Sequence, residues 1–307
     1  MRVLVTGCAG FIGSHLCHKL SLFEGHEIIG VDDLNMENLN YINDLQFTDF
    51  YSIEFFLANI DKIISNVDVV IHLGAISATT EKNWDRLYKF NLNCSKQIAD
   101  QCQLDNVRLI YASSASVYGN GKNGFTEDIP NEKPLNLYAM SKKLFDDYMR
   151  QKWNLNNSIG LRFFNVFGKN ELHKGSMMSV FHKFRDQLLT DGTVQLFGSY
   201  QNVAAGEQKR DFVYVDDCIK VIINGIKKTG TNGIFNVGTG QAISFNEVAE
   251  KIINLHGVGE IKYVEFPDEL KGKYQSYTCA DISKLQMASL LDQPLTLSES
   301  LENFFGQ

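Results

Sequence analysis

Tyr138 and Lys142 stand four residues apart in the segment Tyr-Ala-Met-Ser-Lys. Residues with this spacing share one face of a helix, so the phenol and the ammonium would lie side by side. A phenol with its ordinary pKa of about 10 is a poor base at neutral pH, and a nearby lysine cation favours its ionised form. The pair therefore predicts acid/base chemistry, although the spacing alone also fits a surface pair on a helix.

A serine-rich segment lies 24 residues before Tyr138 and favours the catalytic interpretation. Ser113, Ser114 and Ser116 follow an apolar run at residues 108–112. A hydroxyl group at the end of a strand is placed to orient a reacting oxygen, and Ser114 is the candidate for that role.

A glycine-rich loop near the N-terminus has the pattern G-x-x-G-x-x-G. It consists of Gly7, Gly10 and Gly13, with Phe11 and Ile12 before the last glycine. Such glycines permit a tight turn and close approach of the backbone to a pyrophosphate, whose negative charge faces the N-terminus of the next helix. We expect these five residues to bind a dinucleotide.

Acidic residues after the second predicted strand indicate which dinucleotide is bound. Asp32 lies 19 residues after Gly13, where a carboxylate accepts hydrogen bonds from the adenosine ribose, and Asp33 follows it. The 2′-phosphate of NADP needs a nearby cation, but residues 32–50 contain no Lys or Arg. Repulsion between like charges favours NAD over NADP, and we expect NAD to be tightly bound.

These residues require a sheet that brings strand ends together. Short apolar runs alternate with amphipathic stretches, as is typical of a parallel sheet with helices on both faces. The runs lie at 3–5, 28–31, 67–71, 108–112, 158–161 and 234–237, and the clearest helical stretches at 83–103 and 136–152. We predict an α/β fold built on a Rossmann-like, doubly wound parallel sheet.

The alternation blurs in the second half of the chain, where segments rich in polar, glycine and aromatic residues interrupt it. We predict a dinucleotide-binding domain from residues 1–168 plus 212–240. Residues 169–211 plus 241–307 would form a smaller, discontinuous α/β lobe that binds the substrate.

Composition restricts the partners of this chain. A formal net charge of −7 over 307 residues disfavours nucleic-acid binding, which needs a basic surface. The six cysteines are scattered without a C-x-x-C pair, so we expect free thiols and no metal site. No apolar run approaches the roughly 20 residues of a membrane span, and the first strand starts too early for an export signal. We expect a cytoplasmic protein with no membrane partner.

The order of the glycine loop, the serine segment and the Tyr–Lys pair resembles the extended short-chain dehydrogenase/reductase family. The resemblance implies that Ser114, Tyr138 and Lys142 form a catalytic triad, with Lys142 also bonded to the nicotinamide ribose. The resemblance also places Tyr138 among the cofactor contacts.

Other segments extend this resemblance. His-Leu-Gly-Ala at residues 72–75 is similar to the strand end that touches the cofactor in the family, which implies contacts from Gly74 and Ala75. We also expect Asn91 at the cofactor. Arg210, in Lys-Arg-Asp-Phe-Val-Tyr-Val, resembles the arginine that binds the substrate diphosphate, with a surface salt bridge as the alternative.

Two segments resemble one subfamily more closely, the ADP-glycero-manno-heptose 6-epimerases of bacterial lipopolysaccharide core synthesis. They are Leu-His-Lys-Gly-Ser-Met at 172–177 and Phe-Pro-Asp-Glu-Leu-Lys-Gly-Lys-Tyr-Gln at 266–275. The resemblance implies inversion of C6 by transient oxidation, without net redox change. It gives Lys174 the role of a second acid/base opposite Tyr138, with a phosphate contact as the alternative.

Other residues are expected to bind the nucleotide sugar, with Arg210 and Lys271 as the candidates for its phosphates. The expected substrate contacts are Ser114, Asn165, Lys174, Phe197, Arg210, Lys271 and Tyr274.

The sequence departs from the subfamily at two places. Cys8 replaces a frequent glycine, and no basic residue follows Asp32 although these epimerases commonly use NADP. Alternatives are another nucleotide-sugar epimerase, such as a UDP-hexose 4-epimerase or a heptose-modifying enzyme, or, in a different class, a non-catalytic NAD-binding protein. The resemblance implies a homo-oligomer, and pentamers are known in the family.

Overall fold

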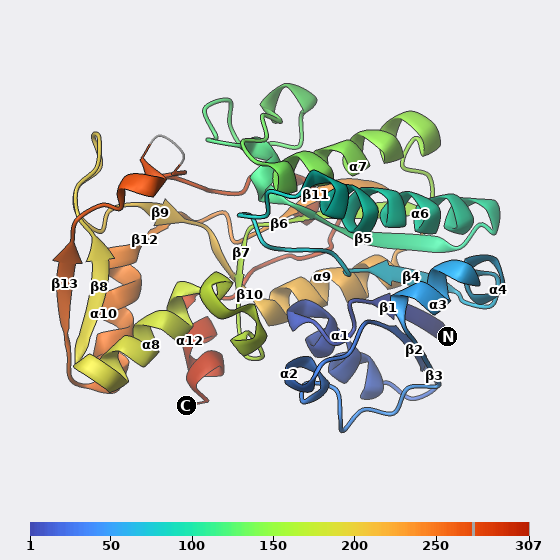
Figure 1. The fold of residues 1–307 in the computed structure, drawn as a ribbon, viewed down its shortest axis with the longest axis horizontal. Coiled ribbons are helices and arrows are strands. Elements are labelled where there is room, and N and C mark those ends of the chain that lie inside the picture. The colour runs from blue at the N-terminus through green and yellow to red at the C-terminus, as the bar shows by residue number, and fades with distance from the viewer. Residues whose placement is uncertain (272–273, 307) are drawn as a thin grey trace.

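The computed structural model describes residues 1–271 and 274–306, and a parallel sheet of seven strands forms its centre (Figure 1). From edge to edge the strand order is β11-β6-β5-β4-β1-β2-β3. The strands are β1 (Arg2–Thr6), β2 (Glu27–Val31), β3 (Asp49–Tyr51), β4 (Val69–His72), β5 (Arg108–Ser114), β6 (Ser158–Phe163) and β11 (Gly233–Val237). The order reverses between β1 and β4, where a doubly wound sheet opens a crevice at the carboxyl ends of its strands.

The predicted Rossmann-like, doubly wound sheet is confirmed, and six of its strands coincide with the apolar runs. β3 was missed because three residues at the sheet edge are too few to show a periodic pattern.

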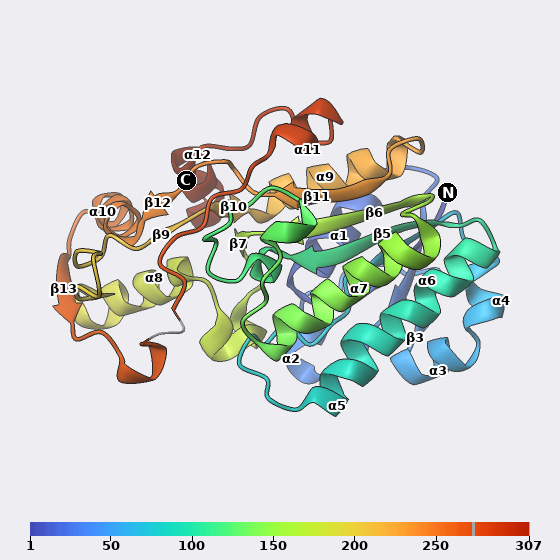
Figure 2. The same ribbon diagram turned by 90° about the horizontal axis from the view of Figure 1, so that it is seen from above.

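Helices cover both faces of the sheet, as Figures 1 and 2 show. One face carries α1 (Phe11–Ser21) and α9 (Val215–Lys227), and the other carries α3 (Ile53–Ala58), α4 (Ile60–Ile64), α6 (Cys94–Leu104) and α7 (Leu137–Trp153). Successive residues of a strand point to opposite faces. In β1, Val3 and Val5 accordingly pack in the core that contains Leu16 of α1, whereas Leu4 packs in the core that contains Ile98 of α6.

The two predicted helical stretches are both present. The first is divided into α5 (Trp84–Leu87), a π-helical segment η1 (Tyr88–Asn93) and α6. The second is α7, whose start is fixed by Asn136, because its side-chain oxygen accepts a hydrogen bond from the backbone N–H of Ala139 at 2.8 Å.

Smaller elements surround one end of the sheet. The small sheets pair β7 (Asn165–Phe167) with β10 (Phe212–Tyr214), β8 (Thr193–Phe197) with β13 (Glu260–Val264), and β9 (Lys209–Arg210) with β12 (Ile243–Ser244). The other helical elements are α2 (Met36–Leu39), η2 (Ala115–Tyr118), η3 (Ile129–Asn131), η4 (Leu172–Met177), α8 (Val180–Asp191), α10 (Phe245–His256), η5 (Asp268–Leu270), α11 (Ser283–Met287) and α12 (Leu297–Phe305). Figure 1 shows β8, β13, α8 and α10 at the end of the molecule away from β3. The division of the chain at residues 168, 212 and 240 stays a prediction.

A buried cluster of charges attaches α7 to the sheet. The fully buried Arg162 of β6 donates to the carboxylate of Asp146 of α7 at 2.8 and 3.0 Å, and also binds Glu132. Arg150, one turn after Asp146 in α7, donates to Glu132 at 2.6 Å. Burial alone would raise the pKa of Glu132, but the hydrogen bonds from the two arginines lower it overall. Each charge in this cluster is therefore compensated by its neighbours.

Replacing Arg162 by Met should lower the free energy of unfolding by about 3–5 kcal/mol, since the buried carboxylate of Asp146 would lose its cation and that of Glu132 would lose one of its partners. Urea unfolding followed by circular dichroism measures this loss. Arg185→Met is the control, because Arg185 pairs with Asp186 at the surface and such a pair contributes about 1 kcal/mol or less. Equal losses in the two variants would contradict a stabilising role for the cluster.

Candidate active site

The loop between β1 and α1 forms a glycine cradle. Gly7 has a φ of +70°, in the left-handed region that suits glycine, and its N–H binds the carbonyl of Val31 at 2.8 Å. A Cβ atom on Gly13 would lie only 1.9 Å from the carbonyl oxygen of Gly7. Helix α1 starts directly after Gly10, so its first N–H groups face this turn. The cradle has the shape and polarity that fit the pyrophosphate of a dinucleotide.

Asp32 lies at the end of β2, beside the cradle. Its carboxylate accepts hydrogen bonds from the backbone N–H of Ala9 at 2.9 Å and of Asp33 at 2.9 Å. Asp33 is exposed and its own carboxylate accepts from the N–H of Ile53. Asn38 of α2 also lines the cavity, and it was not predicted because it belongs to no recognisable motif.

A single cavity of about 600 Å³ collects most of the predicted residues. Its lining includes the predicted residues Gly7, Gly10, Phe11, Ile12, Gly13, Asp32, Gly74, Ala75, Ser114, Tyr138, Lys142, Asn165, Lys174 and Arg210. The cavity also takes in Met177, the last residue of the recognised segment 172–177, and Met178, which follows it; neither was predicted as a contact. The described lining residues do not include five of the predicted contacts, namely Asp33, Asn91, Phe197, Lys271 and Tyr274.

Two neighbouring elements, β5 and α7, place the predicted triad. The ammonium of Lys142 is buried and donates to the carbonyl of Ala112 at 2.8 Å. Burial lowers the pKa of Lys142 to about 8, although the charge of Asp146 opposes this shift. Ser114 ends β5, and its hydroxyl oxygen accepts a hydrogen bond from Ser116 at 2.9 Å.

The environment of Tyr138 differs from the expected one. We expected the cation of Lys142 to lower the pKa of the phenol, but burial raises it, and the group that lowers it is the Ser114 hydroxyl through a hydrogen bond. The expectation is wrong for this arrangement because the ammonium of Lys142 is directed to the Ala112 carbonyl. Ser114 is thus the immediate polar partner of the phenol.

Asn91 lies behind the cavity wall, in the π-helical segment η1. Its side-chain amide binds both backbone groups of Ile76, accepting from the N–H at 2.8 Å and donating to the carbonyl at 3.0 Å. The same amide donates to the Ser141 hydroxyl at 3.2 Å. A π-helical segment displaces side chains from the ordinary helical positions. This geometry makes Asn91 a link between η1, α7 and the segment after Ala75.

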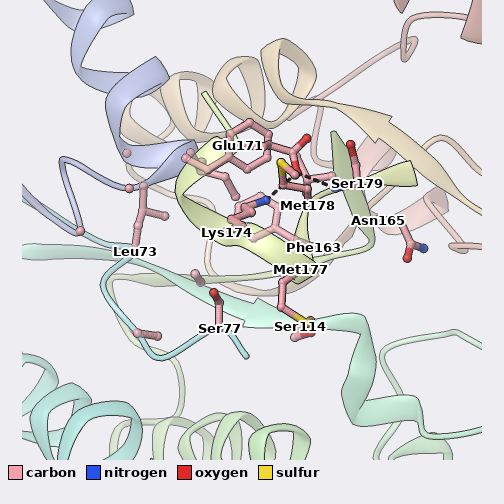
Figure 3. A pocket seen from close by; sticks show the side chains of 18 of the residues that line it. Leu73, Ser77, Ser114, Phe163, Asn165, Glu171, Lys174, Met177, Met178 and Ser179 are labelled. Carbon is pink, nitrogen blue, oxygen red and sulfur yellow. Dashed lines mark hydrogen bonds and ion pairs between the residues drawn. The ribbon is translucent and has the colours of Figure 1, made fainter. Parts of the chain in front are cut away.

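Lys174 enters the cavity from η4. Its ammonium binds the carboxylate of Glu171 at 3.0 Å and lies 3.8 Å from the centre of the Phe11 ring in the cofactor loop. Burial lowers the pKa of Lys174, while the charge and hydrogen bond of Glu171 oppose the shift. Figure 3 shows Lys174 and Ser114 on opposite sides of the pocket. Glu171 was missed because it precedes the recognised segment by one residue.

Arg210 is buried where β9 meets the cavity. The guanidinium carbon of Arg210 lies 4.9 Å from the centre of the Tyr274 ring. Burial lowers the pKa of Arg210, and the charge and hydrogen bond of Tyr274 only partly oppose this shift. Phe197 packs against Tyr274, with ring centres 6.1 Å apart. Asn165 donates to the carbonyl of Asp211 and to the hydroxyl of Thr278. Tyr274 and Phe197 therefore support Arg210 from behind the lining.

Lys271 lies apart from this cavity. It is exposed, forms an ion pair with Asp268, and lines an open hollow that also contains Tyr200 and Phe266. Residues 272 and 273 of the recognised segment lie outside the described residues.

Two features of the described residues bear on metal binding and membrane insertion. Across residues 1–271 and 274–306, the structure contains no group of three or more His, Cys, Asp or Glu side chains placed to hold a metal ion. None of the helices in the same ranges has both the length and the apolar character to cross a bilayer.

Known proteins resemble this chain in sequence and in fold. The ADP-L-glycero-D-manno-heptose-6-epimerase of Alkalilimnicola ehrlichii is 44% identical over 293 residues, covering 93% of this chain and 91% of that protein. The solved structure of the Helicobacter pylori protein of the same name has a TM-score of 0.85 and 26% identity, and covers 99% of this chain and 95% of that chain.

A second solved structure is UDP-glucuronic acid 4-epimerase from Bacillus cereus, in complex with UDP-glucuronic acid and NAD. Its TM-score is 0.81 at 25% identity, with 100% of this chain and 98% of that chain covered. The model of the NAD dependent epimerase/dehydratase family matches residues 3–238. The chain therefore belongs to the NAD-dependent epimerase/dehydratase family.

Proposed function

We propose that this chain is an isomerase that inverts C6 of ADP-glycero-manno-heptose, in the synthesis of the lipopolysaccharide core. The observation that carries the proposal is the placement of Lys174 across one cavity from Ser114, Tyr138 and Lys142. Inversion of a secondary alcohol by oxidation and reduction requires proton transfer at two faces of the sugar, and the cavity holds an acid/base group at each. The two 6-epimerases similar to this chain support the choice of substrate.

The residues of β5 and α7 carry the proton chemistry on one face. The phenol oxygen of Tyr138 takes the proton of the hydroxyl group that is oxidised, and Ser114 orients that oxygen through its own hydroxyl. Lys142, held at the Ala112 carbonyl, would bind the nicotinamide ribose and so position the cofactor beside the reacting group. A dinucleotide held by the glycine cradle and Asp32 would supply the hydride acceptor and donor for this chemistry.

On the other face, Lys174 donates a proton to the oxygen formed when the reduction is completed. Its ammonium belongs to the η4 loop, so the two acid/base groups approach the sugar from different elements. This arrangement favours an acid/base role over a simple phosphate contact.

The substrate phosphates require cations at the opposite end of the cavity from Asp32. We propose that Arg210 binds the diphosphate, since its guanidinium is buried at the lining with an aromatic ring behind it. Asn165 would contact the sugar, and Phe197 and Tyr274 would shape this part of the pocket. Lys271 would reach the nucleotide only from the neighbouring hollow.

We also propose that the bound dinucleotide is NAD in preference to NADP. Asp32 is the charged side chain at the ribose end of the lining, and its carboxylate disfavours a second negative group. The family name and the NAD in the Bacillus cereus structure support this choice. Residues 169–211 plus 241–307 serve as the substrate lobe in this proposal, in a cytoplasmic homo-oligomer.

Proton NMR of the purified protein with ADP-D-glycero-D-manno-heptose, without added cofactor, tests the function directly. We expect the signals of the L-glycero epimer to appear, because a retained dinucleotide is regenerated in each turnover. No inversion, in protein shown to contain NAD, would refute the substrate assignment. Inversion of a UDP-hexose at C4 would then identify a 4-epimerase.

Tyr138→Phe should lower kcat by about 100- to 10,000-fold, because the phenol that moves the proton is lost. The bound cofactor should be retained, since the glycine cradle is unchanged. Tyr88→Phe is the matched control, as the Tyr88 side chain is exposed and is not among the described residues that line the cavity. Near-normal turnover of Tyr138→Phe would remove Tyr138 from the catalytic group.

Asp32→Asn should raise the affinity for NADP relative to NAD by about tenfold or more, which corresponds to about 1.4 kcal/mol. Dissociation constants of both dinucleotides for cofactor-stripped protein measure the ratio. Asp33→Asn is the control and should change the ratio less, because Asp33 is exposed outside the lining. An unchanged ratio in Asp32→Asn would show that the selectivity resides elsewhere.

A further inference from the structure

We infer that Glu171 is a positioning residue for Lys174, which it holds over the cofactor loop as an ammonium ready to donate a proton. The inference rests on the proposed role of Lys174 as the second acid/base. It concerns a residue outside the triad and outside the recognised sequence segments.

The carboxylate of Glu171 is fully buried at the wall of the cavity. One oxygen accepts from the Lys174 ammonium at 3.0 Å and from the backbone N–H of Ser179 at 3.0 Å, as Figure 3 shows. The other accepts from the backbone N–H of Gly168 at 3.0 Å and lies 3.8 Å from Nε2 of His182. A buried carboxylate with this many donors is held in one orientation.

These contacts close the loop that carries Lys174. Gly168 and Ser179 stand at the two ends of that loop, and both donate to the same carboxylate. The backbone turns sharply between them, at Gly175, whose φ is +51°. The side chain of Glu171 therefore fixes both the loop and the position of Lys174 within it.

The second partner of the ammonium is the ring of Phe11, at 3.8 Å from its centre. Phe11 is the first residue of α1 and belongs to the cofactor loop. A cation over an aromatic face is attracted to it, more so when water is excluded. The carboxylate on one side and the ring on the other hold Lys174 directly above the cofactor loop.

Glu171 also sets the charge of Lys174. Burial lowers the pKa of the ammonium, and the neighbouring carboxylate raises it through its charge and hydrogen bond. The other titratable or charged groups around this part of the cavity are His173 in the same loop, His182 and Lys183 on α8, and Asp32, Tyr138, Lys142 and Arg210 across the cavity. The positive charges among these groups disfavour the ammonium form of Lys174, whereas the nearby carboxylate of Glu171 favours it.

The protons balance in this arrangement. On one face the O–H bond of the substrate breaks and its proton passes to the Tyr138 phenolate. On the other face an N–H bond of Lys174 breaks and its proton forms the new O–H bond. The C–H bond that breaks on oxidation would give its hydride to the bound nicotinamide, and the same hydride would form the new C–H bond on reduction, so the substrate gains and loses no hydrogen overall. After the two proton transfers Tyr138 holds a proton and Lys174 lacks one, so a proton must pass from Tyr138 to Lys174, directly or through solvent, before the next turnover starts from an ammonium at Lys174.

Glu171→Gln tests the inference through the pH dependence of epimerisation. Loss of the negative charge lowers the pKa of Lys174, so the alkaline limb of kcat/KM should move to lower pH by about one unit or more. The limb should move equally for both epimers, because the equilibrium between them consumes no proton. The melting temperature and bound cofactor, measured on the same samples, report any purely structural effect.

Two variants control this result. Glu299→Gln removes a carboxylate that also accepts from a backbone N–H, at the surface of α12, and should leave the limb in place. Glu171→Asp keeps the charge at shorter reach and should move the limb in the same direction by less. If Glu171→Gln does not fold, the pH profile of Glu171→Asp decides. An alkaline limb at the same pH as in the unmodified protein would then overturn the inference.

Lys174→Met separates the inference from the proposed function. Loss of inversion in Lys174→Met together with an unmoved limb in Glu171→Gln would overturn the role of Glu171 and leave that of Lys174. Near-normal inversion in Lys174→Met would overturn both. Loss of inversion in Lys174→Met with the shifted limb in Glu171→Gln is the result that we expect.

Discussion

The hydrogen bond between the Lys142 ammonium and the Ala112 carbonyl fixes α7 against the end of β5. The next strand residue, Ser113, donates to Asp146, which lies one helical turn further along α7. Two successive strand residues therefore bind two successive turns of the helix, and this register brings Ser114 to Tyr138. The remainder of the catalytic geometry depends on that contact, because neither residue would meet the other from its own element alone.

This register requires buried charge, which is costly unless each charge has a partner. Arg162 supplies the partner of Asp146 from the adjacent strand β6, and Glu132 and Arg150 complete the cluster. The same low-polarity surroundings lower the pKa of Lys142 to about 8. The buried region behind the active site thus holds the charge cluster that stabilises the fold and also lowers the pKa of Lys142.

The crevice itself depends on contacts between strands that are distant in sequence. His72 at the end of β4 binds the Thr6 hydroxyl of β1 at 2.7 Å and the Ser95 hydroxyl of α6 at 2.8 Å. Burial, and then the charge of Lys142, lower the pKa of His72 to about 3, so the imidazole joins these elements as a neutral group. The glycine cradle and the loop after β4 are consequently held at one position.

The sequence by itself determined the features that depend on neighbours in the chain. The spacing of Tyr138 and Lys142 places both on one helical face, and the glycines after the first strand permit the turn at Gly7, because helix periodicity and turn conformation are local properties. Apolar runs likewise predicted the main strands, apart from the short edge strand β3. These local rules also led to the carboxylate at Asp32.

The tertiary structure decided which groups surround each side chain. It showed that burial raises the pKa of Tyr138, that Lys174 is paired with Glu171, and that Asn91 lies behind the cavity. It also showed that Lys271 lies in a separate hollow. Desolvation and ion pairing depend on residues that folding brings together from distant parts of the chain, and the spacing of residues along the sequence does not encode them directly.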